Sequence, residues 1–232
     1  LCRWPLKALV RKHVRTGADV TLLLHRRAPE NTLGGGIGVD GSGRVTRFRE
    51  YEAHGEVRKR HVFAGAHVLS PKILDRVENR AGDIIQELYQ PLLEEGATFS
   101  TLVFDGRWHD LGTPGRYLAA NLDQARGFLP RSFWRGIVSS PLARIEPSAS
   151  IHRSIIGQEA EIGAGSSIEC SLILPDARVG KDCRIQGSIV GPGVRLAPSS
   201  NVEKRMINRL DKRHELGPGE SVIGDLVYTP LG

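Results

Sequence analysis

The chain has 232 residues, of which 40% are hydrophobic and 25% are charged. This balance is typical of a soluble globular protein, and the length predicts one large domain or two small ones. The formal net charge of +6 suits an anionic ligand without demanding nucleic acid. No apolar run reaches the roughly 20 residues that span a bilayer, and the first residues do not form a signal peptide. The three cysteines are scattered, which excludes a disulfide scaffold and a zinc module and indicates a reducing cytosol.

The position of the only methionine bears on the extent of the chain. It is Met206, so the sequence does not begin with an initiator residue. Removal of an initiator methionine normally requires a small second residue, and Leu1 is not small. We therefore expect the chain to be a fragment that has lost an N-terminal part.

The first half alternates between helical and extended patterns. Strands that alternate with helices indicate an α/β layer with a mainly parallel sheet. Ser70, Asp83 and Thr113 each stand where a helix cap is expected, and Pro91 predicts a kink. The expected elements are a helix over 5–16 with Leu6, Leu9, Val10 and Val14 inward, a strand over 20–24, a hairpin within 37–48, a strand over 61–69, a short helix with Ile73, Leu74 and Val77 inward, a helix over 84–95, a strand over 97–104 and a helix from Thr113 to Ala125.

The second half repeats with a period of 17 residues in three ungapped blocks, 154–170, 171–187 and 188–204. Residues 137–153 fit the same register more weakly. Aliphatic positions about six residues apart, often followed by Gly, predict a parallel β-helix whose stacked turns share a narrow core. The aligned columns are Ile156, Ile173 and Val190; Ile162, Val179 and Leu196; Ile168, Ile185 and Val202; and Ala160, Ala177 and Val194.

The segment FDGRWHDLGTPGRYLAAN (104–121) places acidic and aromatic residues before a helix. Strand ends that face the start of a helix are where α/β folds bind ligands, and the carboxylate of Asp110 could hold a hard cation. The alternative is that Asp110 only forms a turn or caps the helix. The spacing alone favours this alternative.

The stretch GRWHDLGTPGRYLAAN, preceded by GIGVDGSGRVTRF and FAGAHVLSPKIL and followed by the repeats, resembles the sugar-1-phosphate nucleotidyltransferases. Within them it is similar to the mannose-1-phosphate guanylyltransferase or NDP-sugar synthase type. The resemblance runs from residue 1 to about residue 204. It implies that an oxygen of a sugar 1-phosphate attacks the α-phosphorus of a nucleoside triphosphate, giving an NDP-sugar and pyrophosphate. Mg²⁺ and cationic groups would neutralise the charge.

The resemblance also implies roles for five residues. Gly35 would line the sugar, Glu50 would accept hydrogen bonds from sugar hydroxyls, and Gly65 would let the sugar approach closely. Trp108 would belong to the substrate site, and Asp110 would be one of two carboxylates that hold Mg²⁺. The other carboxylate and the Gly-rich triphosphate loop of the family do not occur in this sequence, in agreement with a missing N-terminal part.

One further departure concerns the sugar phosphate. The family has Lys-Pro after the residue that matches Glu50, and that lysine contacts the sugar phosphate, whereas Tyr51-Glu52 follow here. A cation from residues 58–60 could replace the lysine. The other interpretation, which the composition favours, is that residues 58–60 form a solvated basic loop.

Four other candidate sites are weaker. Residues 34–38 are rich in Gly but lack the helix start, arginine and lysine of a phosphate-binding loop. His109 adjoins Asp110, but neighbouring residues in an extended chain point apart, so we expect a structural role. His152 in the repeat could hint at an acyltransferase, which would leave the α/β half unexplained. The basic pairs near the N-terminus have no interleaved aromatic residues, so nucleic-acid binding is not expected.

These observations predict an α/β fold class, with the C-terminal half of a Rossmann-like nucleotidyltransferase domain (1–130), a short left-handed parallel β-helix (137–207) and a C-terminal tail (208–232). The predicted function is transfer of a nucleotidyl group from a nucleoside triphosphate to a sugar 1-phosphate in the cytoplasm, with Mg²⁺ as cofactor and no membrane partner. The β-helix could build a homo-oligomer. The chain as given is expected to be inactive because it lacks the triphosphate loop. The alternative is a non-catalytic regulatory or scaffold relative that binds sugar nucleotide.

Overall fold

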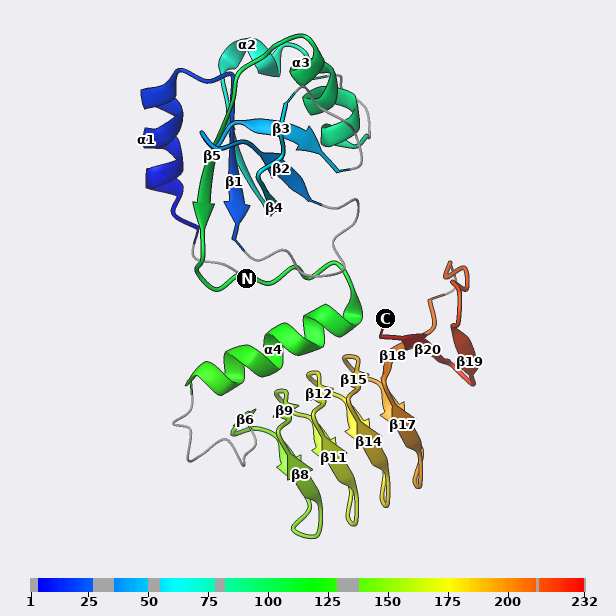
Figure 1. The fold of residues 1–232 in the computed structure, drawn as a ribbon. Helices are drawn as coiled ribbons and strands as arrows, with labels where there is room; N and C mark the ends of the chain where they lie inside the picture. Colours follow the sequence, from blue (N-terminus) through cyan, green and yellow to red (C-terminus); the bar gives the residue numbers. More distant parts are fainter. Residues whose placement is uncertain are drawn as a thin grey trace. The chain divides into compact units, whose positions relative to one another are not determined.

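The computed structural model describes residues 4–26, 36–49, 55–77, 82–128, 138–211 and 213–231. Contacts divide the chain into two units, Leu1–Trp108 and His109–Gly232, which are drawn in Figure 1. The division therefore precedes the helix that the sequence analysis placed in a first domain ending at residue 130. None of the described helices is long and apolar enough to cross a membrane.

The first unit is built on a sheet of five strands in the order β3-β2-β4-β1-β5. Only β1 and β5 are parallel, and the other three pairs are antiparallel. The expectation of a mainly parallel sheet is wrong for these strands, because the chain returns from β1 to β4 through a hairpin and not through a crossover helix. The strands are β1 (Val20–His25), β2 (Ile37–Val39), β3 (Val45–Phe48), β4 (Lys59–Leu69) and β5 (Phe99–Phe104).

Helices cover both faces of the part of the sheet formed by β4, β1 and β5 (Figure 1). On one face, Leu9 of α1 packs against Leu23 and Ala64. On the other face, a larger core around Phe48 and Tyr89 packs the hairpin and the later helices against the strands. The helices are α1 (Leu6–Thr16), α2 (Pro71–Leu74), the π-helical turn η2 (Ile85–Tyr89) and α3 (Gln90–Glu94).

Two helices bury less than their sequence pattern predicts. In α1 only Leu9 is buried, whereas Leu6, Val10 and Val14 are 52%, 49% and 74% exposed. The helix touches the sheet along one narrow line, and its apolar stripe is wider than that line. The short α2 likewise buries Ile73 and leaves Leu74 exposed.

The helix expected over 84–95 is divided near Pro91. The π-helical turn η2 precedes α3, which has this proline in its first turn. A proline has no N–H and its ring crowds the preceding turn, so the wider turn removes the conflict without ending the segment. At the start of the segment, Asp83 Oδ1 accepts a hydrogen bond from the N–H of Ile85 at 2.8 Å, as expected of a cap.

The carboxylate of Asp19 holds together three segments at one end of the sheet. Its Oδ2 accepts hydrogen bonds from the N–H of Thr98 at 2.8 Å and from the Thr98 hydroxyl at 2.9 Å. Its Oδ1 pairs with Lys72 Nζ at 2.5 Å. The contact with Lys72 has the largest effect on the pKa of Asp19, followed by the hydrogen bonds from Thr98. Together they lower this pKa from its ordinary value of 3.8 to about 2.

The second unit contains the predicted parallel β-helix, and its strands form three sheets along the repeat. Neighbouring strands pair 17 residues apart, as in Ile156 with Ile173 and Ile173 with Val190, so the predicted period and columns are confirmed. The first sheet contains β6 (Val138–Ser139), β9 (Ile155–Ile156), β12 (Leu172–Ile173), β15 (Ile189–Val190) and β18 (Arg205–Arg209). The second contains β7 (Arg144–Ile145), β10 (Glu161–Ile162), β13 (Arg178–Val179) and β16 (Arg195–Leu196). The third contains β8 (Ser150–His152), β11 (Ser167–Glu169), β14 (Arg184–Gln186) and β17 (Asn201–Glu203).

A column of buried serines connects successive turns of the β-helix. Ser171 Oγ donates a hydrogen bond to the carbonyl of Glu169 at 2.6 Å and accepts one from the N–H of Ser188 at 3.0 Å. Ser154 and Ser188 make the same pair of contacts one turn before and one turn after. Backbone groups at this corner are thereby satisfied inside the core, where an unpaired polar group is costly.

Segments on either side of the repeat complete the second unit. The helix α4 (Pro114–Phe128) packs Leu118 against Leu172 and Ile189 of the β-helix, along which it lies in Figure 1. The segment 208–232, expected to be a tail, instead continues β18 and adds β19 (Ser221–Ile223) and β20 (Leu226–Pro230) as antiparallel neighbours.

The serine column gives a first prediction. Ser171→Ala should lower the free energy of unfolding of the β-helix by about 1–3 kcal/mol, because it leaves the buried N–H of Ser188 without a partner. The exposed Ser167, in the same turn, provides the matched control, and Ser167→Ala should change stability by less than about 0.5 kcal/mol. Urea unfolding followed by far-UV circular dichroism measures both. Equal midpoints for the two variants would contradict the role of the column.

Asp19 gives a second prediction, in which pH is the variable. Because the folded-state pKa is about 2 and the ordinary value is 3.8, the carboxylate stabilises the fold above pH 3.8, and this stability is lost as the pH falls toward 2. Asp19→Asn should cost about 2 kcal/mol near pH 7 and almost nothing near pH 2. Urea midpoints at several pH values test this, with the exposed Glu56→Gln as control. A cost independent of pH would show that charge is not the cause.

Candidate functional site

One part of the candidate site lies in the first unit, where the parallel strands β1 and β5 end. The indole Nε1–H of Trp108, which follows β5, donates a hydrogen bond to the carbonyl of Ala64 in β4 at 3.2 Å. The indole also stacks on the imidazole of His25, the last residue of β1, with ring centroids 5.5 Å apart and planes at 25°. His25 Nε2 lies 3.0 Å from the carbonyl oxygen of Gly106. These contacts fix the loop after β5 against the ends of two strands.

Gly65 lies in a bulge of β4 beside this contact. Leu22 pairs with His67 and Leu24 pairs with Phe63. The chain therefore advances by four residues in β4 where it advances by two in β1, which leaves two extra residues in β4. The extra residues bend the strand, and Gly65 takes φ +83°, which an L side chain rarely adopts. A Cβ at this position would have space, so the backbone angle and not crowding requires glycine. The bulge leaves Gly65 exposed next to the carbonyl that Trp108 binds.

The structure therefore brings two predicted substrate-binding residues, Gly65 and Trp108, close together at the bulge of β4. It also adds His25, which the sequence analysis did not select. The available signal was a histidine that directly ends the buried run VTLLL, at the kind of strand end where α/β proteins place functional groups. The predicted residues Gly35 and Glu50 lie outside the described residues. Gly36 follows Gly35 and Arg49 precedes Glu50, and both of these neighbours are described. The N–H of Arg49 donates a hydrogen bond to the carbonyl of Gly36 at 2.9 Å.

Asp110 belongs to the second unit, at the start of α4. Its Oδ1 accepts a hydrogen bond from the N–H of Gly112 at 2.9 Å, and its Oδ2 forms an ion pair with the guanidinium of Arg116. Thr113 Oγ1 accepts a hydrogen bond from the N–H of Arg116 at 3.3 Å and so caps the helix as expected. These contacts are those of a turn residue, which is one of the two alternatives that the sequence left open.

A metal ion would need more than this carboxylate. Among the described residues, no group of three or more His, Cys, Asp or Glu side chains is placed to hold one. Mg²⁺ can nevertheless be held by one or two carboxylates when substrate phosphates and water complete its coordination. Asp110 fits such a role as a single ligand, in exchange for its contact with Arg116.

The remaining candidates occupy structural positions. His109 pairs with Asp123 of α4 at 3.1 Å, which agrees with a structural role. Residues 58–60, which we had interpreted as a solvated loop, are strand residues from Lys59 onward, because β4 begins there and pairs with β2. Gly36 and Gly38 belong to the start of the hairpin and not to the start of a helix, as expected for a stretch that is no phosphate loop.

Comparisons with known proteins agree with this organisation. The family model described as "Nucleotidyl transferase" matches residues 1–127, and the model described as "GMPPB C-terminal domain" matches residues 135–229. The chain is 30% identical over 124 residues to mannose-1-phosphate guanyltransferase beta-B of Xenopus laevis, covering 51% of this chain and 32% of that protein. It is 29% identical over 167 residues to mannose-1-phosphate guanylyltransferase of Mycobacterium tuberculosis, and the match covers 69% of this chain and 46% of that protein.

A third relative is the probable mannose-1-phosphate guanylyltransferase 3 of Arabidopsis thaliana, 28% identical over 118 residues that cover 51% of this chain and 35% of that protein. The chain thus spans between a third and a half of the length of these relatives. The nucleotidyl transferase model matches more than half of the chain, and the predicted α/β fold followed by a β-helix is the one observed. The chain is therefore a member of the sugar-1-phosphate nucleotidyltransferase family.

Proposed function

We propose that this chain provides the sugar-1-phosphate-binding elements of a nucleotidyltransferase of the mannose-1-phosphate guanylyltransferase type. In that reaction, a phosphate oxygen of mannose 1-phosphate forms a bond to the α-phosphorus of GTP. The bond from this phosphorus to the bridging oxygen of the β-phosphate breaks, and pyrophosphate leaves. The family matches and the printed names of the relatives support this reaction.

The observation that carries the proposal is the hydrogen bond from Trp108 to the carbonyl of Ala64. It joins two segments that are 44 residues apart and that the resemblance assigns to the substrate site. Trp108 and His25 form an aromatic wall beside the exposed backbone at Gly65. A sugar ring placed there could hydrogen-bond to the backbone without meeting a side chain at this position, and the wall would exclude water from one side of it.

Asp110 and Mg²⁺ form the charged part of the proposal. Asp110 would be the residue of this chain that holds the ion, which would neutralise negative charge on the phosphates when bound. Without the ion, the guanidinium of Arg116 neutralises the charge of the Asp110 carboxylate. When Asp110 holds the ion, it would release Arg116. The guanidinium of Arg116 would then be available to phosphate oxygens, for which it is well suited.

The second candidate is a non-catalytic relative that binds a sugar nucleotide. Two observations favour it: Tyr51-Glu52 follow Glu50 where the family has Lys-Pro, and the described residues include no group of three or more His, Cys, Asp or Glu side chains placed to hold a metal ion. Such a protein would keep the sugar-binding edge at Gly65 and Trp108. It would bind GDP-mannose more tightly than mannose 1-phosphate, because the nucleotide offers contacts that the sugar phosphate lacks.

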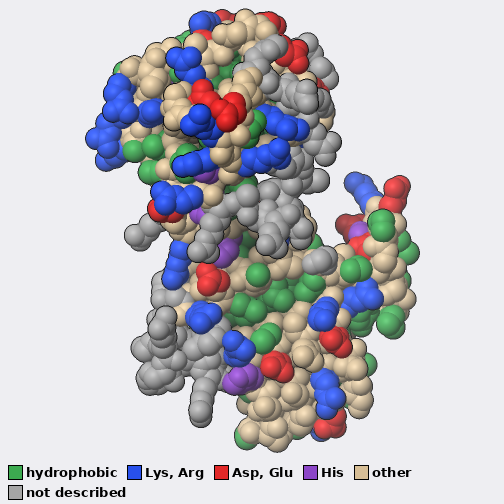
Figure 2. Space-filling model, in the orientation of Figure 1, with side chains coloured by type: hydrophobic (Ala, Val, Ile, Leu, Met, Phe, Trp, Pro, Cys, Tyr) green, Lys and Arg blue, Asp and Glu red, His purple; other side chains and the backbone are tan. Residues whose placement is uncertain are grey.

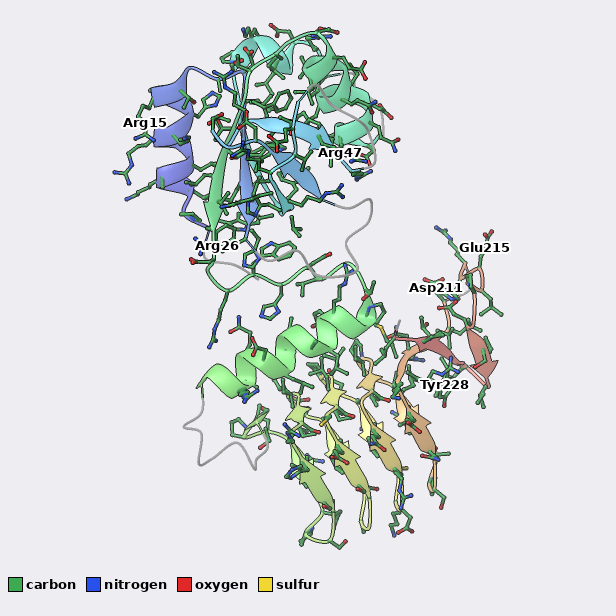
Figure 3. The ribbon with its side chains drawn as sticks, in the orientation of Figure 1. Arg15, Arg26, Arg47, Asp211, Glu215 and Tyr228 are labelled. Atoms are coloured by element: carbon green, nitrogen blue, oxygen red, sulfur yellow. The ribbon has the colours of Figure 1, made fainter. Side chains whose placement is uncertain are left out.

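Binding and turnover test the proposal separately. Mannose 1-phosphate should bind the chain with a Kd of about 10 µM to 1 mM, the usual range for such substrates, as measured by isothermal titration calorimetry. Trp108→Phe removes the indole N–H and should weaken this binding about three- to tenfold, because the Ala64–Gly65 backbone loses its anchor. Tyr228→Phe, on the C-terminal hairpin labelled in Figure 3, removes a donor from another ring and should have no effect.

Turnover is measured as pyrophosphate release from GTP and mannose 1-phosphate with Mg²⁺. Because the 232 residues contain no Gly-rich triphosphate loop, we expect no release by the chain alone. Release that Asp110→Ala abolishes would overturn this expectation and show that the chain is catalytic. No binding of either mannose 1-phosphate or GDP-mannose by the unmodified chain would refute the proposed function itself.

A further inference from the structure

A second hollow in the first unit is lined by none of the residues that we assign to the sugar or the metal ion. It is a cavity of about 960 Å³ bounded by the hairpin tip 40–43, by residues 58–61 and by the ends of β1 and β5. Thr101 Oγ1 of β5 donates a hydrogen bond to the carbonyl of Gly43 at 2.7 Å. This bond holds the hairpin tip against β5, so that the hairpin closes over one face of the sheet and leaves the cavity at its mouth.

Strand pairing decides which side chains face this cavity. Lys59 pairs with Val39 and His61 with Ile37, and Val39 and Ile37 belong to the core between the hairpin and the sheet. Paired residues of antiparallel strands lie on the same face, so Lys59 and His61 point to that side as well. Lys59 is an exposed residue that lines the cavity together with His61.

The lining is strongly cationic. Arg26 and Arg58 join Lys59 around the opening, and Figure 2 shows Lys and Arg side chains gathered on this unit. Among the described lining residues the only acidic one is Asp40, whose Oδ1 already accepts hydrogen bonds from the N–H and hydroxyl of Ser42 at 2.8 and 2.7 Å and from the N–H of Arg44 at 3.0 Å. Asp40 therefore serves the turn and offers little charge to the cations.

The ion pairs of the two arginines are weak. Arg26 lies 3.7 Å from Asp105, and Arg58 lies 3.3 Å from Glu56, with all four side chains more than 60% exposed. Exposed pairs of this kind are screened by water and contribute little. A multiply charged anion in the cavity would compete for both guanidinium groups with better geometry, because guanidinium forms paired hydrogen bonds with phosphate oxygens.

His61 supplies a second, independent observation. The residue is 6% exposed, and its Nδ1 is buried without a hydrogen-bond partner among the described residues. Burial lowers the pKa of the imidazole, so the ring is neutral near pH 7 and adds no charge of its own. His61 is one of the residues that line the cavity, so a buried polar atom without a partner lies beside its cationic wall, and such atoms are rare in folded proteins.

The composition of the lining also indicates the kind of anion. Among the described residues that line the cavity there is no Phe, Tyr or Trp, so these residues provide none of the stacking surfaces that single-stranded nucleic acid uses. The cations gather around an open hollow, at whose mouth Arg26 and Arg58 are exposed. This arrangement fits a small anion with several negative charges.

We propose that the cavity between the hairpin tip and residues 58–61 binds a diphosphate group, with Lys59, Arg58 and Arg26 as its cationic contacts. The group can come from inorganic pyrophosphate or from a nucleoside diphosphate, since both present the same oxygens. The site is formed by residues 39–43 and 58–61, by Arg26 after β1, and by Thr101 and Val103 of β5. It does not use Gly65, Trp108 or Asp110.

Calorimetric titration of the full chain with inorganic pyrophosphate and, separately, with GDP tests this, without metal and at low salt. Saturable binding is expected, and the double variant Arg58→Gln, Lys59→Gln should weaken it at least tenfold, or about 1.4 kcal/mol. Both residues are exposed, so the fold should be retained. The matched control is Arg11→Gln, Arg15→Gln, which removes the same charge from α1, where Arg15 points away from the sheet in Figure 3.

Each result decides the proposal. Loss confined to the cavity variant supports it, and equal loss in the control variant would show that only net charge matters and would overturn it. Absence of saturable pyrophosphate binding up to about 5 mM would also overturn it, because that affinity is too low for a built site. GDP that binds much more tightly than pyrophosphate identifies a nucleotide as the source. Trp108→Phe should leave pyrophosphate binding unchanged, which separates this outcome from failure of the proposed function.

Discussion

The bulge in β4 opposite Leu23 is the constraint on which the first unit depends. The bulge inserts two extra residues into β4. Because two is an even number, the side chains before and after the bulge alternate between the same two faces of the sheet. Phe63 and His67 can therefore face the same core and stack at 5.9 Å. On one side the bulge exposes Gly65 beside the anchor of Trp108. On the other, Lys59 and His61 pair with strand β2 of the hairpin. The bulge thus places the first candidate region, and the pairing of β4 with β2 places the second.

The β-helix solves a different problem, because its turns are too short to bury much surface alone. Aliphatic columns provide the core, and the serine column satisfies backbone groups at one corner. The corners also require left-handed backbone angles at the 17-residue period. Gly165, Asp182 and Ser199 form one such series, with φ between 56° and 70°. Only one of the three is glycine, so the stacking of turns stabilises conformations that an isolated segment would avoid.

The two units contribute different things to the proposed function. The first carries an edge with exposed backbone, an aromatic wall and a cationic cavity, which are features suited to a phosphorylated sugar and to anions. The second carries Asp110, whose neighbours Gly112 and Arg116 hold it at the start of α4. The packing of α4 on the β-helix through Leu118 fixes this carboxylate relative to the repeat.

The sequence by itself determined what depends on local pattern. The period of 17, the buried columns, the hairpin at Asp40 and the cap at Thr113 all follow from residue type and spacing, and all are observed. Strand direction, the bulge at Gly65 and the exposure of Leu6 and Val14 in α1 were decided by tertiary structure. Pairing partners and packing area arise between segments distant in the chain, and no local pattern encodes them. The contact of Trp108 with Ala64 belongs to the same class, because only the folded sheet brings residues 44 positions apart within hydrogen-bond distance.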